Sequence, residues 1–314
     1  MKQENQTPGQ GGAMDIISMR SLSKDNVTSL IKLTEKIESG SISLDISGHL
    51  VALLFFEPST RTAFSFDSAI KRLGGQTIIM QETKSSSVQK GESFADTIKT
   101  VSQYADAIVI RSAIEGAARF ASEIVNIPVI NAGDGANQHP TQTLLDLYTI
   151  KKQQKTVENR KVAIVGDLRY GRAVYSLVYG LAMFNAELYL ISPEHLKIRA
   201  YVRHDLDKMG IKYHESEDIS AVLDKVDVMY VTRIQRERFA GQYEYEKVKD
   251  SYQITRSMVE SASLKNNFTL LHPLPRVNEI TTDVDSLPCA HYFAQAKNGM
   301  YMRQAIIASL LGVV

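Results

Sequence analysis

Continuous apolar runs alternate with amphipathic stretches along most of the chain. The apolar runs predict strands at 50–56, 77–81, 107–111 and 128–131, and then at 161–166, 187–192, 228–232 and 268–272. The intervening stretches predict helices at 60–73, 92–104, 115–125, from Pro140 to about 150, 172–184, 195–209 and about 290–311. Strands that are apolar throughout and alternate with helices are typical of parallel sheets covered on both faces.

A polar stretch from Lys151 to Asn159 separates the two halves of this pattern. Because the alternation restarts after it, we predict an α/β fold with two doubly wound parallel-sheet domains in tandem. We place the first domain at 15–156 with the C-terminal helix 300–314, the second at 157–299, and a disordered leader at 1–14. Ligands of such sheets bind beyond the carboxyl ends of the strands, so the site is expected in those loops.

The first strand-end loop carries the most informative motif, Ser59-Thr60-Arg61-Thr62. Pro58 ends the strand, and a helix begins at once with three hydroxyl groups and an arginine. Free backbone N–H groups and the positive end of the helix dipole favour an anion at such a helix start. The hydroxyl and guanidinium donors suit a phosphate dianion. We therefore expect a small phosphorylated ligand.

Two further strand ends in the first half carry polar residues. Arg111 ends the strand 107–111, where a surface arginine is the simpler interpretation. The Gly-rich loop 131–142 leads into a helix and contains His139 and Gln142, whose spacing of three lets them point the same way. A capped turn with a structural histidine is the alternative for this loop.

The turn His272-Pro273-Leu274-Pro275-Arg276 follows the last predicted strand. Its two prolines fix the backbone and remove two N–H donors, which leaves carbonyl groups able to accept a hydrogen bond from a ligand amine. A rigid turn at a domain edge is the alternative. Leu274-Pro275 is a candidate for a cis peptide bond.

The second half adds residues that are candidates for binding the carboxylate groups of a ligand. Arg172, Arg233 and Gln235 follow strands, and guanidinium groups bind carboxylates through two hydrogen bonds. Arg236 and Arg238 are interpreted as part of a solvated basic loop, which is also the alternative for the other residues of this segment. The segment 165–172 lacks the G-x-G-x-x-G spacing, which disfavours a nicotinamide or flavin cofactor.

The composition excludes some classes of partner and cofactor. Lys and Arg number 36 against 35 Asp and Glu, a net charge of +1, which argues against nucleic acid or an acidic membrane as the main partner. No apolar stretch is long enough to span a bilayer. The single cysteine, Cys289, excludes an internal disulfide and a cysteine-cluster metal site. We expect a cytoplasmic protein without metal or cofactor.

These motifs together resemble the aspartate and ornithine carbamoyltransferases, in the same order and over nearly all of 16–314. The resemblance implies that the phosphate of carbamoyl phosphate is held by Ser59, Thr60, Arg61 and Thr62. It implies that Arg111 and His139, with Thr62, contact the carbonyl oxygen. The resemblance further implies that the amide of carbamoyl phosphate is held by Gln142 and by the turn formed by Pro273, Leu274 and Pro275.

The resemblance also implies roles for the acceptor and for the assembly. Arg172, Arg233 and Gln235 would bind the two carboxylates of aspartate. Ser86 and Lys90 match a loop that enters the active site of a neighbouring subunit, which implies a homotrimer with shared sites. The catalytic residues implied are Arg61, Thr62, Lys90, Arg111 and His139. The family has members that assemble with regulatory chains, a partner that the sequence leaves open.

The expected reaction is carbamoyl transfer from carbamoyl phosphate to the α-amine of aspartate, an early step of pyrimidine biosynthesis. Ornithine enzymes typically carry cysteine where Pro273 stands here, and two arginines suit a dianionic acceptor better than an ammonium side chain. A transcarbamylase for ornithine or another amino acid is the alternative. A binding module without catalysis is disfavoured, since Arg61, His139 and Lys90 are all present.

Overall fold

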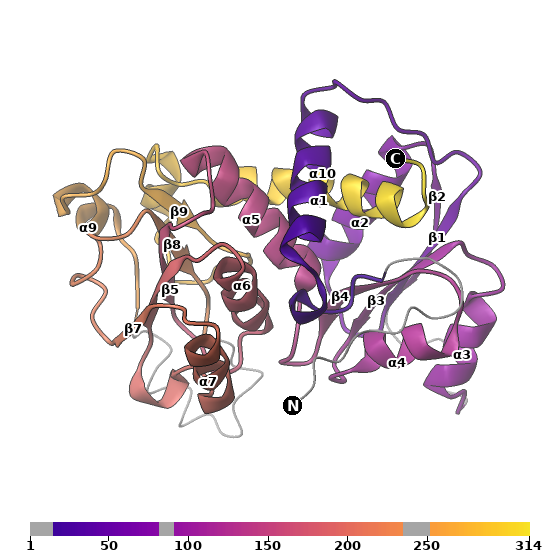
Figure 1. Ribbon diagram of the computed structural model, residues 1–314, viewed down its shortest axis with the longest axis horizontal. Coiled ribbons are helices and arrows are strands. Elements are labelled where there is room, and N and C mark those ends of the chain that lie inside the picture. Colours follow the sequence, from indigo (N-terminus) through magenta and orange to yellow (C-terminus); the bar gives the residue numbers. More distant parts are fainter. Residues whose placement is uncertain (1–14, 82–90, 235–251) are drawn as a thin grey trace. The chain divides into compact units, whose positions relative to one another are not determined.

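The computed structural model describes residues 15–81, 91–234 and 252–314 (Figure 1). The chain divides into two compact units, one formed by the residues up to Leu144 with Gly299–Val314, and the other by Leu145–Asn298. This division falls inside two helices, α5 (Pro140–Gln154) and α10 (Tyr292–Leu310). Each unit contains one parallel sheet, which confirms the predicted fold class.

The first unit is built on a sheet with the strand order β2-β1-β3-β4. Helices α3 and α4 cover one face of this sheet, and α1, α2 and α10 lie on the other (Figure 1). The strands are β1 (Leu50–Phe55), β2 (Gln76–Gln81), β3 (Ala107–Ser112) and β4 (Val129–Asp134). The helices are η1 (Met19–Ser21), α1 (Lys24–Glu38), α2 (Thr60–Arg72), α3 (Phe94–Val101) and α4 (Ala117–Ile124).

Successive side chains along each strand point to opposite faces of this sheet, and those on one face form a core cluster. Ala52 and Leu54 of β1 pack in one cluster with Ile98 of α3 and Ala118 of α4. Because β1 is central and covered on both faces, nearly all of its side chains are buried, and its sequence is apolar throughout. This double burial explains why the apolar run predicted the strand.

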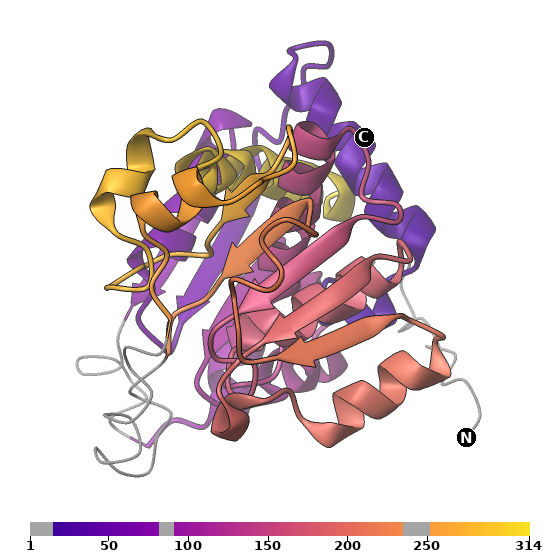
Figure 2. The same ribbon diagram turned by 90° about the vertical axis from the view of Figure 1, so that its left-hand side faces the viewer.

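The second unit is built on a sheet with the order β7-β6-β5-β8-β9, whose parallel strands are seen in Figure 2. One core cluster joins Val165 and Val231 of the sheet to Val259 of α9 and Tyr292 of α10. The strands are β5 (Lys161–Val165), β6 (Glu187–Ile191), β7 (Tyr213–Ser216), β8 (Val228–Val231) and β9 (Thr269–Leu271). The helices are α6 (Arg172–Ala182), η4 (Glu194–Leu196), α7 (Ala200–Lys208), α9 (Arg256–Ser261) and η6 (Thr282–Ser286).

Several elements of the second unit differ from the prediction, among them the short helix α9, which was not expected. The helix predicted at 195–209 is split into η4 and α7, because the carbonyl of Leu196 accepts a hydrogen bond from Leu168 N–H at 3.1 Å and the chain is extended at Lys197 and Arg199. Strand β7 was not predicted, since it is a largely exposed edge strand with the polar sequence Tyr-His-Glu-Ser.

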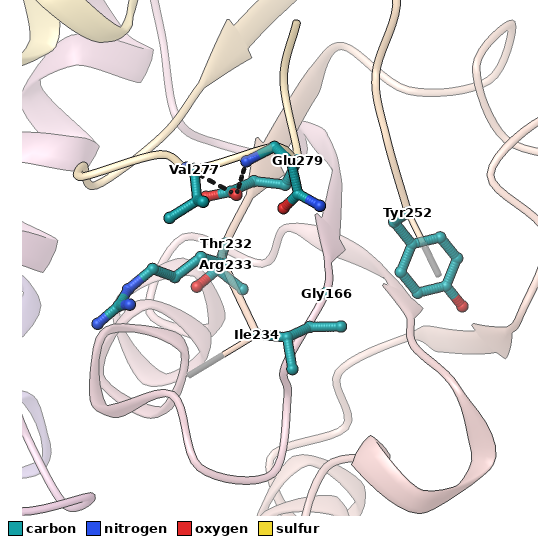
Figure 3. A pocket seen from close by; sticks show the side chains of 8 residues that line it. Gly166, Thr232, Arg233, Ile234, Tyr252, Val277 and Glu279 are labelled. Carbon is teal, nitrogen blue, oxygen red and sulfur yellow. Dashed lines mark hydrogen bonds between the residues drawn. The ribbon is translucent and has the colours of Figure 1, made fainter. Parts of the chain in front are cut away.

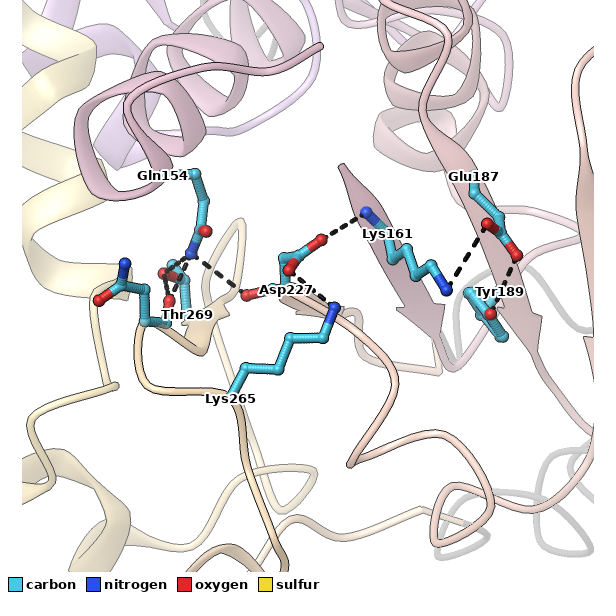
Figure 4. Close-up of polar contacts among 8 residues, drawn as sticks. Gln154, Lys161, Glu187, Tyr189, Asp227, Lys265 and Thr269 are labelled. Atoms are coloured by element: carbon cyan, nitrogen blue, oxygen red, sulfur yellow. Dashed lines mark hydrogen bonds and ion pairs between the residues drawn. The ribbon is translucent and has the colours of Figure 1, made fainter. Parts of the chain in front are cut away.

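A polar network lies at the amino ends of the strands in the second unit (Figure 4). The Asp227 carboxylate accepts a hydrogen bond from Lys161 N–H at 2.8 Å and pairs with Lys265 at 2.9 Å. The Glu187 carboxylate accepts a hydrogen bond from the Tyr189 hydroxyl at 3.0 Å. It also pairs with Lys212 and His214 at 2.9 Å each and with Lys161 at 3.8 Å. These charges stabilise the sheet edge opposite the carboxyl ends.

Cys289 is half-buried against the core cluster of the second unit, and its carbonyl accepts a hydrogen bond from Leu270 N–H at 2.8 Å. Within 15–81, 91–234 and 252–314, no helix combines the length and apolarity that a membrane crossing requires.

Candidate active site

The motif Ser59-Thr60-Arg61-Thr62 forms the start of α2, directly beyond the carboxyl end of β1. Ser59 occupies the N-cap position but makes no side-chain capping hydrogen bond, and the first turn contains no acidic residue. Serine normally caps its own helix, and because Ser59 does not, its side chain does not compete with an anion at the positive end of the helix dipole. Thr62 is buried and Arg61 is exposed. The geometry therefore suits an anion at this helix start.

Arg111 lies at the carboxyl end of β3, beside the end of β1. The parallel register pairs Arg111 with Phe55, the last residue of β1, so the two strand ends lie next to each other. The Arg111 guanidinium donates to the carbonyl of Ala132 at 3.1 Å and lies 3.9 Å from a carboxylate oxygen of Glu57. Only 12% of its side chain is exposed, so Arg111 is a fixed cation and not a surface arginine.

The loop after β4 is organised by a buried carboxylate, Asp134, that no sequence motif marks as important. Asp134 accepts hydrogen bonds from the N–H groups of Gly116 and Gln138 at 2.8 and 3.0 Å. It also accepts from the side-chain amides of Asn131 and Asn137, both at 2.9 Å. This network holds the loop that ends at His139, and the small polar residues of the loop were its only sequence signal.

His139 and Gln142 lie at the start of α5, and both side chains are buried. The Gln142 N–H donates to the His139 carbonyl at 3.0 Å, and the Thr141 hydroxyl lies 3.4 Å from His139 Nδ1. The predicted spacing at a helix start is therefore confirmed. Within the first unit, the candidate residues from β1, β3 and β4 follow neighbouring strands of one sheet, at its carboxyl edge.

The turn 272–276 follows β9, and its Leu274-Pro275 peptide bond is cis, as predicted. Leu274 has a φ of 54°, in the left-handed region that non-glycine residues rarely adopt. The backbone hydrogen bonds of the described residues do not use the carbonyl of Pro273 or Leu274. Arg276 instead forms a paired contact with the Asp285 carboxylate and donates to the Tyr292 hydroxyl, which makes it structural.

A pocket opens at the carboxyl ends of β5 and β8 (Figure 3). Its lining residues are Gly166, Thr232, Arg233, Ile234, Tyr252, Val277, Asn278 and Glu279. Gly166 has a φ of 121°, and a Cβ there would overlap the backbone carbonyl oxygen of Thr232. Only glycine therefore allows the two strand ends to approach so closely. This approach fixes the backbone of Thr232, the residue directly before Arg233.

Arg172, the first residue of α6, also belongs to this unit and is buried. The half-buried Arg233 and the buried Arg172 supply fixed guanidinium groups of the kind that bind carboxylates. Ser86, Lys90 and Gln235 lie outside the described residues, as do Arg236 and Arg238. Among the residues that the structure describes, no group of three or more His, Cys, Asp or Glu side chains is placed to hold a metal ion.

Two family models match the chain, one for each half. The carbamoyl-P binding domain of aspartate/ornithine carbamoyltransferase matches residues 14–152, and the Asp/Orn binding domain of the same family matches residues 158–310. The chain belongs to the aspartate/ornithine carbamoyltransferase family. This result confirms the resemblance inferred from the motifs.

Relatives within this carbamoyltransferase family carry more specific names. The chain is 50% identical to a Thermococcus onnurineus protein named aspartate carbamoyltransferase catalytic subunit, over 96% of this chain and 97% of the relative. It resembles the solved catalytic subunit of M. jannaschii aspartate transcarbamoylase with a TM-score of 0.86 and 48% identity, over 95% of this chain and 98% of that one. Aspartate transcarbamoylase from Trypanosoma cruzi, solved with carbamoyl phosphate and aspartate, matches with a TM-score of 0.88 and 35% identity, over 95% and 96%.

Proposed function

We propose that this chain transfers the carbamoyl group of carbamoyl phosphate to the α-amine of L-aspartate, giving N-carbamoyl-L-aspartate and phosphate. One observation carries the proposal: the chain is 50% identical, over 96% of its length, to a relative that is named for this activity. Solved relatives that contain carbamoyl phosphate with aspartate, or carbamoyl aspartate with phosphate, support the same substrates and products. The ornithine alternative is not favoured, because the named relatives act on aspartate.

Residues 15–156 with 300–314 are the proposed carbamoyl-phosphate-binding domain, and 157–299 the proposed aspartate-binding domain. Ser59, Thr60, Arg61 and Thr62 bind the phosphate at the start of α2, where Ser59 makes no capping hydrogen bond and the helix dipole favours an anion. Arg111 and His139 contact the carbonyl oxygen together with Thr62. Their burial and fixed contacts favour this role, because preorganised donors stabilise a developing oxyanion best.

The aspartate α-amine attacks the carbonyl carbon, and a tetrahedral oxyanion forms. The bond from that carbon to the bridging phosphate oxygen then breaks, and the departing phosphate takes the amine proton. Positioning and electrostatic stabilisation provide the rate enhancement, with Arg61, Thr62, Arg111, His139 and Lys90 as the catalytic residues. Arg172, Arg233 and Gln235 hold the two carboxylates of aspartate, and Ser86 acts beside Lys90.

The proposed assembly is a homotrimer in which Ser86 and Lys90 act in the site of a neighbouring subunit. Large apolar side chains support an interface on the first unit. Phe64 of α2 is 65% exposed, and Ile78 and Ile79 of the edge strand β2 are also exposed. Such groups are stabilised when a partner covers them. The proposed setting is the cytoplasm, at an early step of pyrimidine biosynthesis, and regulatory chains are a further proposed partner.

Formation of N-carbamoyl-L-aspartate from the two substrates tests the proposed function directly. The parent chain is expected to form the product, and Arg61→Ala to lower kcat/KM by roughly 100-fold or more, as the loss of an oxyanion or phosphate donor does elsewhere. Arg72→Ala is the matched control, because Arg72 lies on the exposed last turn of the same helix. A parent that carbamoylates ornithine and not aspartate would establish the alternative.

A further inference from the structure

The turn 272–276 is held by a buried histidine–carboxylate pair that has no assigned role. His272 Nε2 lies 2.8 Å from Glu279 Oε1, with only 1% of the His272 side chain and 7% of the Glu279 side chain exposed. On the other side of the ring, the Leu274 N–H donates to His272 Nδ1 at 2.8 Å. The ring therefore links the backbone of the turn to a carboxylate seven residues later in the sequence.

These two contacts define the proton on the ring. Nδ1 accepts from Leu274, so it carries no hydrogen, and the ring hydrogen lies on Nε2 and is donated to Glu279. Burial lowers the pKa of His272, which keeps the ring neutral as this arrangement requires. Burial is the largest single influence on Glu279 and would raise its pKa, but the interaction with His272 and the backbone hydrogen bonds together outweigh it, so the pKa is lowered and the carboxylate stays ionised.

The carboxylate is itself fixed by the backbone. Glu279 Oε2 accepts from the N–H groups of Val277 and Asn278 at 3.0 and 3.1 Å, the contacts drawn as dashed lines in Figure 3. Both oxygens of Glu279 are thus used as acceptors, which a carboxylate allows and an amide does not. The pair forms a rigid bridge from the chain after the turn to Leu274 inside it.

Leu274 needs such a bridge. Its φ of 54° is unfavourable for a leucine, and conformations of this kind persist only where the surroundings impose them. The His272 ring accepts the N–H of this residue and so fixes the plane of the Pro273–Leu274 peptide. The direction of the Pro273 carbonyl, which belongs to that peptide, is fixed with it.

We propose that His272 and Glu279 are positioning residues that aim the carbonyl group of Pro273 at the amide of carbamoyl phosphate. This inference rests on the proposed function and on the role that the family resemblance implies for this turn, in which the carbonyl accepts a hydrogen bond from that amide. The pair thereby selects carbamoyl phosphate over inorganic phosphate, which has the same anionic group but no amide to recognise.

Two substitutions at His272 separate the contacts of the ring. His272→Asn places an amide oxygen near the position of Nδ1, so it keeps an acceptor for Leu274 and loses the contact with Glu279. His272→Gln places an amide nitrogen near the position of Nε2, so it keeps a donor to Glu279 and loses the acceptor. The readout is the KM for carbamoyl phosphate divided by the Ki of inorganic phosphate as an inhibitor, both from the carbamoyl-aspartate assay.

We expect this ratio to rise roughly 10-fold in His272→Gln, and clearly less in His272→Asn, with the Ki of phosphate unchanged in both. The isosteric variant Glu279→Gln is also expected to raise this ratio. It provides a second test of the pair if a His272 variant fails to fold. Thr269→Val is the control for stability alone, because it removes a buried hydroxyl from β9 that accepts from Gln154, without touching the turn.

The proposal is overturned if the KM of carbamoyl phosphate and the Ki of phosphate rise together, if His272→Asn is impaired as much as His272→Gln, or if Thr269→Val raises the ratio equally. These results differ from a failure of the proposed function, in which the parent chain itself forms no carbamoyl-aspartate.

Discussion

The carboxylate of Asp134 lies 2.9 Å from the amide nitrogen of Asn131, and both side chains are buried in the loop that leads to His139. The Asn131 amide also donates to the carbonyl of Ile17 at 3.0 Å, which ties the loop to the N-terminal segment of the first unit. The shape of this loop thus depends on two side chains that face the protein interior and not a ligand.

Asp134→Asn is expected to destabilise the chain by about 1–3 kcal/mol. The amide nitrogen of the new side chain would face N–H groups that now donate to the Asp134 carboxylate, so those donors would lose their acceptor. We also expect kcat to fall, since His139 follows this loop. Urea denaturation and the carbamoyl-aspartate assay measure the two effects. Asp218→Asn is the matched control, an exposed aspartate that accepts from Ser220 N–H and hydroxyl, and it should leave both unchanged. An Asp134→Asn variant with parental stability would contradict the role of the network.

Gly166→Ala should raise the KM for aspartate more than the KM for carbamoyl phosphate, because the new Cβ pushes against Thr232, the neighbour of Arg233. The matched control is Gly210→Ala. Gly210 also has a positive φ, of 68°, but a Cβ there meets open space. Both variants therefore carry backbone strain, and only the first displaces the pocket. Equal changes in the two KM values of Gly166→Ala would show that Arg233 has not been displaced specifically.

The charge network at Glu187 predicts a pH-dependent stability. The hydrogen bond from Lys212, helped by those from His214 and Tyr189, lowers the pKa of Glu187 from 4.5 to about 2. A lowered pKa in the folded state stabilises the chain fully above the ordinary pKa, and this contribution is lost as the pH falls from 4.5 toward 2. The variant Glu187→Gln lacks this contribution. The difference in free energy of unfolding between parent and variant should therefore be largest near pH 7 and shrink toward pH 3.

Urea denaturation of parent and variant at several pH values measures this trend. Glu260→Gln provides the comparison, because Glu260 pairs with Arg256 one helical turn away and both side chains are well exposed. A deficit in Glu187→Gln that stays constant from pH 7 to pH 3 would exclude the proposed electrostatic origin.

Mixing inactive variants tests whether active sites are shared between subunits. Arg61→Ala and Lys90→Ala are each expected to be nearly inactive. After dissociation and joint reassembly of equal amounts, about one quarter of the sites would combine an intact Arg61 with an intact Lys90 from different chains. Arg61→Ala mixed with Arg111→Ala should recover nothing, because one chain supplies both residues to a site. Recovery in both mixtures, or in neither, would exclude the proposed sharing.

The sequence predicted the elements that are buried on both faces. The central strands β1 and β5 lie within one residue of their predicted ends, because double burial demands an apolar run. Strand β7 was missed since one exposed edge strand needs no such run, and α9 was missed because six residues are too few for a helical period. The split at Leu196 depends on a hydrogen bond from Leu168, which no local pattern reveals.

The candidate site divides in the same way. Residues that meet a ligand, such as Arg61 and His139, stand out because their chemistry at a strand end is unusual. Residues that hold them in place do not, because Asp134 and Glu279 act through partners that only the folded chain brings together. The buried pairing of Glu279 with His272 could not be inferred from two polar residues seven positions apart.

The single cysteine gives this chain a built-in reporter of local unfolding. Burial raises the pKa of the Cys289 thiol, and the thiolate is the form that reacts with alkylating reagents. Native chains are therefore expected to be modified slowly at neutral pH, at a rate limited by transient opening of the segment beside β9. Because the chain has no other thiol, the rate of alkylation measures how often this segment opens. The segment pairs with β9, the strand that leads into the turn at His272.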